Sequence, residues 1–279
     1  IFCAIITLLA PGSCQTGDCI RDTLVACDTL LIYQPQEAKD RLMDLNPQKF
    51  TEKDRAYYDF LLTIAQDKVN YEFSNDSLIA AAVTWYKTSN EVFNYTRALL
   101  YHGIVRFNIH QHSVEAFKLF KAAEAVMDSN NIQDNGLKCL LYAYLGDITL
   151  RNKEYKKADS YYEKGLYFSR KAGNYRNYII ALMDFLFTRK LVLKDEATSW
   201  KLFGELMALD SIPADLLASV THMKAVFHKT PGATQLAIYQ LIGNAESVKK
   251  SERSKYYYTA SKYAAEMGQV KAGIEYGEA

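Results

Sequence analysis

The chain has few of the residues that interrupt helices. Its 279 residues include 5 prolines and 13 glycines, and no long stretch alternates β-branched with polar residues. Pro removes a backbone donor, Gly weakens a helix interior, and half-buried strands need alternation. Apolar residues instead recur at spacings of three and four, as at Leu61, Leu62 and Ala65. The composition therefore argues against a β protein and favours an all-α fold.

Neither sign of charge dominates. Lys and Arg total 33 against 32 Asp and Glu, and the densest basic cluster spans residues 249–255. Acidic residues are interleaved on the same predicted helices, which is typical of a solvated face. We expect no direct nucleic-acid binding by this portion of the protein.

Motifs that carry catalysis are missing from the sequence. It contains no Gly-rich phosphate loop, no Gly-x-Ser-x-Gly elbow and no His-Glu-x-x-His stretch. His110 and His112 share a turn, but no Cys or carboxylate accompanies them at a ligand spacing. We expect no metal site, no cofactor and no enzymatic activity.

The N-terminal segment has the character of a targeting sequence. Residues 1–10 are apolar apart from Thr7, too short for the roughly twenty residues that span a bilayer. They match the core of a secretory signal. Gly12-Ser13-Cys14 resembles a bacterial lipobox, in which the Cys thiol is acylated. We predict that residues 1–14 are a signal peptide or lipobox segment, truncated at its start, with Cys14 lipidated; an ordinary signal peptide or a membrane-anchor fragment is the alternative.

The remaining cysteines show no paired metal-binding spacing. On one helix, Cys19 and Cys27 would lie about two turns apart, too far for a disulfide. If the chain near Cys19 is extended, a bridge becomes possible. Cys139 lies on an apolar helical face and is expected to be a small core residue.

The most regular pattern lies near the middle of the chain. Tyr142, Leu145 and Gly146 are followed by Ala158 and Tyr162. Two helices cross closely only where side chains are small, and large aromatic side chains fill the space beside the crossing. The spacing predicts a helix-turn-helix hairpin whose turn is formed by residues 152–154.

The pattern recurs elsewhere. Upstream, Leu99 and Gly103 are followed by Ala116 and Phe120. Near the end of the chain, one partial copy is formed by Ala260, Ala272 and Tyr276. An array of hairpins is therefore predicted, because one hairpin cannot bury both of its faces alone.

These residues resemble the tetratricopeptide repeat (TPR), whose signature is an aromatic, Leu-Gly, an aromatic, then Ala and an aromatic four later. The resemblance implies an all-α fold, a right-handed α-α superhelix of about seven hairpins over residues 15–279. The clearest repeats are expected at about 96–129 and 139–172, and the last repeat is expected to be cut off.

Start and stop signals divide the chain into expected helices. Pro35 occupies a first turn, Asn46-Pro47 ends that helix, and residues 51–54 form a capping signal. Residues 74–77 are expected to cap the next helix. A single helix is predicted from Asn174 to Leu193, followed by its partner from Glu196 to Leu209.

The N-terminal third is similar to a secreted or membrane-tethered TPR family. The similarity rests on Pro35-Gln36-Glu37-Ala38 through Leu45-Asn46-Pro47, then residues 54–58 and 75–79. Such proteins are common in anaerobic Gram-negative gut bacteria and often continue into a membrane helix and an output module. The resemblance implies a cell-envelope location, facing the periplasm, with a lipid anchor or a C-terminal transmembrane helix outside these residues.

In stacked hairpins the first helix of each pair lines the concave groove, and residues not used in packing point into it. On this basis the predicted protein-binding groove comprises Leu100, Ile104, Phe107, Asn108, Ala143, Asp147, Leu150 and Arg151. Their mixture of apolar and charged types suits an amphipathic helix or an extended segment. Alternatively, Asp147 and Arg151 merely pair at i, i+4 on a wet surface.

Two functions follow from these observations. The first is a non-catalytic scaffold that binds a protein or peptide, as the sensor part of a signalling or regulatory protein. The second is an accessory solenoid lipoprotein of a secreted enzyme or nutrient-uptake complex. We favour the first, because the sequence supplies no nucleophile, acid-base pair or cofactor loop.

Overall fold

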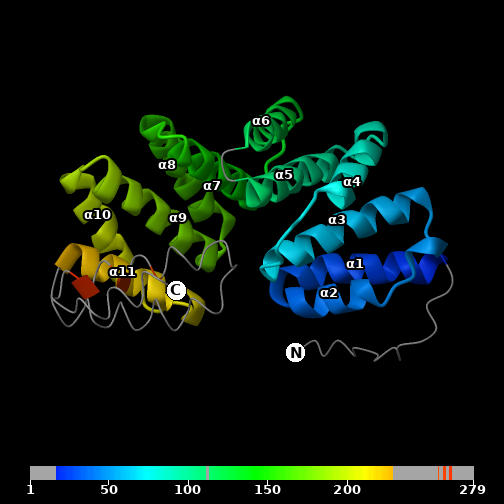
Figure 1. Cartoon of the computed structure of the whole chain (residues 1–279), viewed down its shortest axis with the longest axis horizontal. Helices are drawn as coiled ribbons and strands as arrows, with labels where there is room; N and C mark the ends of the chain where they lie inside the picture. The colour runs from blue at the N-terminus through cyan, green and yellow to red at the C-terminus, as the bar shows by residue number, and fades with distance from the viewer. Residues whose placement is uncertain (1–16, 111–112, 229–256, 258–259, 262–263, 266–279) are drawn as a thin grey trace. The chain divides into compact units, whose positions relative to one another are not determined.

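The computed structural model describes residues 17–110, 113–228, 257, 260, 261, 264 and 265, and all regular structure within them is helical (Figure 1). The α-helices are α1 (Gly17–Tyr33), α2 (Pro35–Met43), α3 (Glu52–Lys68), α4 (Ser77–Thr88), α5 (Val92–Ile109), α6 (Val114–Ser129), α7 (Asn135–Arg151), α8 (Tyr155–Ala172), α9 (Tyr175–Phe187), α10 (Glu196–Met207) and α11 (Leu217–His228). Short 3₁₀ turns occupy Pro47–Lys49 and Ala214–Leu216, and Thr188–Val192 forms a π-helical turn.

Several helix starts follow the sequence signals. Pro35 is the first residue of α2. The Thr51 side chain accepts a hydrogen bond from the Asp54 backbone N–H at 3.1 Å, which caps α3. The Asn75 side chain accepts one from the Ser77 backbone N–H at the start of α4. The predicted cap at 51–54 is confirmed, and α4 begins within 74–77 as predicted, but its N-cap residue Asp76 makes no side-chain capping hydrogen bond.

The helix predicted from Asn174 to Leu193 is shorter than expected. It ends as α9 at Phe187, and the π-turn follows. The side chain of Arg189 in this turn forms ion pairs with Asp159 at 2.6 Å and Asp195 at 2.8 Å. Lys194 then adopts φ 60°, in the left-handed region, which ends the helical path. The pair with Asp159, 30 positions away in the sequence, cannot be read from the local helical pattern.

The chain divides into two compact units. The first contains the described residues up to Tyr71 together with Asn75–His102, and the second contains Glu72–Ser74 and the described residues from Gly103 onward. In the first unit, α1, α2 and α3 each contact the other two, and α4 packs on α3. Each helix thus packs on its sequence neighbour, and α1 also contacts α3, the first helix of the next pair, as in stacked hairpins.

A partly buried ionic network joins the helices of the first unit. Arg97 on α5 pairs with Asp28 on α1 at 2.7 Å, and the Tyr57 hydroxyl on α3 donates to the same carboxylate at 2.8 Å. Cys27 is a buried free thiol, so no Cys19–Cys27 bridge exists. Cys19 and Cys27 both lie on the helix α1, which is the case in which the sequence predicts no bridge between them.

In the second unit, α7 and α8 form the predicted hairpin. A Cβ added at Gly146 would lie 2.5 Å from the Tyr162 ring, and Ala158 is fully buried. The upstream copy has the same packing, because a Cβ at Gly103 would lie 2.5 Å from the Phe120 ring. Small residues therefore accommodate large rings at both crossings, as the spacing predicts.

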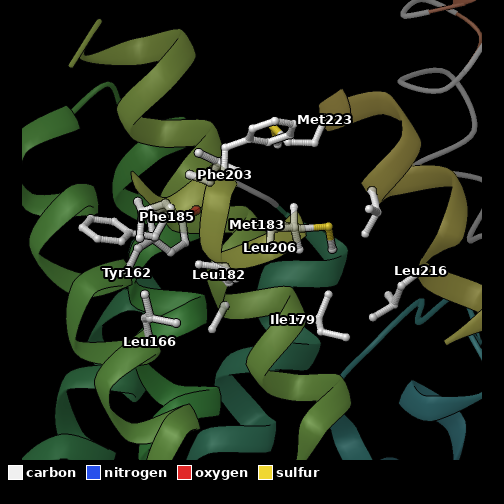
Figure 2. Packing of buried hydrophobic residues seen from close by; sticks show 14 of the residues in the cluster. Tyr162, Leu166, Ile179, Leu182, Met183, Phe185, Phe203, Leu206, Leu216 and Met223 are labelled. Atoms are coloured by element: carbon white, nitrogen blue, oxygen red, sulfur yellow. The ribbon is translucent and has the colours of Figure 1, made fainter. Parts of the chain in front are cut away.

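The core of the second unit continues from α8 into α9, α10 and α11. Figure 2 shows Tyr162 and Leu166 beside Leu182 and Phe185, with Phe203 further along the same cluster. Leu182 and Leu186 are completely buried. This apolar core fixes the position of α9 relative to the α7–α8 hairpin.

Of the third predicted repeat, only Ala260 is described, and it is fully buried. Ala272 and Tyr276 lie outside the described residues, as do residues 1–14 with Cys14. In the ranges that the structure describes, no helix is long and apolar enough to cross a membrane.

Candidate binding site on α7 and α9

Packing of the α7–α8 hairpin positions the first acidic group of the site. Asp147 follows Gly146 on α7, where the Tyr162 ring fills the space left by the glycine. The Tyr162 hydroxyl donates a hydrogen bond to Oδ1 of Asp147 at 2.6 Å. The crossing therefore carries a polar contact at its edge, and this contact orients the carboxylate.

A second carboxylate comes from α9, which contacts both α7 and α8. Burial raises the pKa of Asp184 well above its usual range, and the nearby Asp147 carboxylate raises this pKa further. The Asp184 side chain is partly exposed. Two acidic side chains from neighbouring helices thus influence each other electrostatically.

Asp184 also influences the pKa values of two neutral groups, Tyr162 and Cys139. Burial, Asp147 and Asp184 all raise the pKa of Tyr162, so that its phenol stays protonated and acts as a donor. Burial raises the pKa of Cys139 to about 11, with a further contribution from Asp184. The thiol and the phenol are both neutral near pH 7.

Arg151 is the cation nearest to this region on α7. Its guanidinium lies over the Phe107 ring, 5.3 Å from the ring centroid. Phe107 in turn meets the Tyr144 ring edge-on at 5.7 Å between centroids. Arg151 also lowers the pKa of Tyr162, but this is the smallest of the influences on that group.

The structure separates the predicted groove residues into two sets. Leu100 and Ile104 have no exposed surface, and Phe107 is 5 % exposed. The prediction is wrong for these three, because they are buried in the core and a ligand cannot reach them in this conformation. The predicted residues that are partly exposed are Asn108, Ala143, Asp147, Leu150 and Arg151.

The alternative interpretation, a simple surface pair of Asp147 and Arg151, leaves out part of what these side chains do. Asp147 accepts a hydrogen bond from α8, and Arg151 stacks on an aromatic ring of α5. Both side chains therefore contact elements other than their own helix.

Asp184 was not among the sequence-predicted site residues. The signal was nevertheless present, because Asp184 is the one charged residue in the apolar segment Ile179–Phe187. Charged residues are rarely buried without a pairing group, and an isolated acid in an apolar run is therefore informative. Its proximity to Asp147 emerges only when α7 and α9 pack together.

A separate recess lies at the turn between α8 and α9. It has a volume of about 300 Å³ and is lined by Ser169, Arg170, Gly173, Asn174, Tyr175 and Tyr178. Its charged group is already neutralised, since Arg170 pairs with Glu205 at 2.7 Å. Within the described ranges, no group of three or more His, Cys, Asp or Glu side chains is placed to hold a metal ion.

Comparison with known proteins identifies the fold. No protein-family model matches the sequence, and no curated protein matches it. Among solved structures, the chain is similar to the crystal structure of the apo form of RapI, with a TM-score of 0.68 and 14% sequence identity. The match covers 93% of this chain and 95% of RapI. This chain is an all-helical repeat protein, and the predicted all-α fold class is confirmed.

Proposed function

We propose that this protein is a non-catalytic scaffold that binds a protein or peptide segment on the exposed face of α7 and α9, as the interaction part of a regulatory protein. The observation that carries the proposal is the polar group of α7, where the Tyr162 hydroxyl orients the partly exposed Asp147 carboxylate at 2.6 Å and Arg151 lies over the Phe107 ring. Residues that are held in place yet remain partly exposed can contact a partner segment.

The chemistry of the face suits a polypeptide ligand. Ala143 and Leu150 supply small and apolar contacts beside the polar groups of Asp147 and Arg151, and all four are partly exposed. Helical arrays present extended surfaces of this kind to partner segments. The likeness to RapI supports the fold, while the binding role rests on the side chains.

We propose a cell-envelope location from the sequence alone. The apolar segment 1–10 and the Gly-Ser-Cys14 motif support a secreted or membrane-tethered protein of the kind found in anaerobic Gram-negative gut bacteria. Growth with a radioactive fatty acid tests this, since the wild-type protein should incorporate label and Cys14→Ala should not. Label retained in Cys14→Ala would contradict lipidation at this residue.

An accessory solenoid of a secreted enzyme or nutrient-uptake complex is the second candidate. It is favoured by the same N-terminal segment. The gene separates the two roles, because a membrane helix and an output domain downstream of Ala279 support regulation. A stop codon within a few repeats supports the accessory lipoprotein.

A photo-crosslinking amino acid tests the binding face directly. We expect a crosslinker at Ala143, on the partly exposed part of α7, to yield a defined protein adduct in the native host. The same crosslinker at Lys157, on the exposed side of α8, is the matched control. Equal adducts at both positions, or none at Ala143, would contradict the proposal.

A further inference from the structure

Lysine and aromatic side chains share one side of α8 and the adjoining part of α7, within the second unit. The members on α8 follow one another at steps of three, four and three residues, which places them on the same side of the helix. We name this surface the lysine–aromatic patch, and it consists of Lys138, Tyr142, Tyr161, Lys164, Phe168 and Lys171.

The aromatic rings of the patch form one connected stack between the two helices. The Tyr142 ring on α7 is nearly parallel to the Phe168 ring on α8, with 5.6 Å between centroids and 8° between planes. Tyr161 also stacks on Tyr142, with 6.1 Å between centroids. Tyr142 is buried, and the other two side chains are partly exposed. The stack is therefore a packed base at the surface of the α7–α8 hairpin.

The lysines of the patch are held by aromatic side chains. Nζ of Lys138 lies 5.3 Å from the centroid of the Phe168 ring, and Nζ of Lys164 lies 5.1 Å from that of Tyr142. Lys171 donates a hydrogen bond to the Tyr167 hydroxyl. Among the described residues, none forms an ion pair with these three lysines. A ring attracts a cation without cancelling its charge, so all three ammonium groups can still bind a carboxylate.

Acidic residues near the patch leave this positive charge in excess. Glu124 on α6 is buried and pairs with Lys121. Asp128, at the end of α6, raises the pKa of Tyr142 but pairs with none of the three lysines. Glu163 precedes Lys164 by one position and is therefore turned about 100° away around α8.

We propose that the lysine–aromatic patch binds an acidic segment of a partner protein, whose carboxylates contact neighbouring lysines. Lys164 and Lys171 are seven positions apart, which is about 10 Å along the helix axis. Carboxylates three positions apart on an extended chain are separated by about the same distance. Because the rings already restrict the lysine side chains, binding costs less conformational entropy than it does at freely moving lysines.

The arrangement of the rings favours a polypeptide over single-stranded nucleic acid. Nucleobases bind such surfaces by stacking on open ring faces. Tyr142 and Phe168 stack on each other, and each also has a lysine ammonium over its ring. The ammonium groups are therefore the main contacts that the patch offers, and they suit carboxylates.

The patch is separate from the binding face on α7 and α9. Tyr142 and Asp147 are five positions apart, which turns them about 140° from each other around α7. Lys157, the crosslinking control, is eleven positions from Phe168, about 16 Å along α8, and it pairs with Glu154. The acidic segment therefore occupies a second surface, and its binding does not depend on the α7–α9 face.

Fluorescence polarisation of labelled, end-blocked peptides tests the patch at low ionic strength. Hexaglutamate should bind to the wild-type protein, and its uncharged analogue hexaglutamine should not. The double variant Lys164→Gln/Lys171→Gln should bind hexaglutamate at least about fivefold more weakly, because two ammonium groups are lost. Both side chains are exposed, so the variant should fold normally, which circular dichroism checks.

Lys156→Gln is the matched control, since it removes an exposed ammonium from another side of α8 and should leave hexaglutamate binding unchanged. Equal losses in the control and the double variant, or equal binding of hexaglutamine, would overturn the proposal. Labelled oligothymidylate and vesicles of phosphatidylglycerol provide the comparison with other anions. Tighter binding of either one than of hexaglutamate, lost in the double variant, would assign the patch to nucleic acid or membrane and refute the acidic segment.

Discussion

The Tyr162 ring occupies the space in which a side chain on Gly146 would lie, with only 2.5 Å between an added Cβ and the ring. Tyr162 cannot move away freely, because it is 3 % exposed and its hydroxyl is hydrogen-bonded to Asp147. The closeness of α7 and α8 therefore depends on the absence of one methyl group. The same crossing holds the carboxylate of the candidate site in place.

Gly146→Ala should lower the free energy of unfolding by about 1–3 kcal/mol, because overpacking displaces the buried ring. Gly204→Ala on α10 is the matched control, since nothing lies within 4 Å of its added Cβ. That substitution should stabilise the protein by about 0.5–1 kcal/mol through helix propensity. Urea denaturation measures both, and equal effects would contradict the crossing geometry.

Arg97→Met should destabilise the first unit by about 2–3 kcal/mol, because it leaves the Asp28 carboxylate without its ionic partner. The two side chains are 19% and 23% exposed, so solvent screening brings the expected loss below that for a fully buried pair. Arg41→Met removes the exposed Arg41–Glu37 pair on α2 and should change stability by about 0.5 kcal/mol or less. Fluorescence of Trp85 on α4 reports the unfolding of this unit. If Arg97→Met lowers the free energy of unfolding no more than Arg41→Met does, the ionic network does not stabilise this unit.

The same pair predicts an acid dependence. Burial raises the pKa of Asp28, but hydrogen bonds from Arg97 and Tyr57 and the charge of Arg97 outweigh burial, so the net pKa is lowered. A lowered folded-state pKa stabilises the protein above the unfolded pKa, and this stability is lost as pH falls through the folded value. We expect Arg97→Met to weaken this acid dependence in urea titrations at several pH values. An unchanged slope of stability against pH would refute the assignment to Asp28.

Asp184→Asn should have the opposite pH signature. Because the folded-state pKa of Asp184 is raised, the folded protein binds its proton more tightly than the unfolded chain does. Its contribution to stability is present below the unfolded pKa and is lost as pH rises toward the folded value. Relative to wild type, Asp184→Asn should therefore become increasingly stable as pH rises, measured by urea denaturation from pH about 4.5 upward. A constant difference across pH would show that Asp184 titrates normally.

The two buried thiols should resist alkylation in the folded protein. Burial raises the pKa of both Cys27 and Cys139 to about 11, so almost no reactive thiolate exists near pH 8. We expect iodoacetamide to modify each at least about 100-fold more slowly than in denaturant, with the sites quantified by peptide mass spectrometry. Rapid native labelling of Cys139 would show that the α7 core opens readily.

Local patterns in the sequence predicted much of the fold. The Gly146–Tyr162 and Gly103–Phe120 spacings predicted two crossings, and Thr51 and Pro35 predicted helix starts, because each depends on residues close together in the chain. The π-turn after α9 escaped prediction, since Arg189 is held by ion pairs with other segments. The candidate site was predicted only in part for the same reason.

What the sequence by itself determined was the helical character of the chain, its hairpin spacing and the identity of Asp147 as a polar residue on a first helix. Helical periodicity and small-residue spacing act over one or two turns, so these features can be read locally. Tertiary structure alone decided that Leu100 and Ile104 are core residues and that Asp147 raises the pKa of Asp184. Burial and electrostatic proximity depend on which helices pack together, and that information belongs to the folded chain.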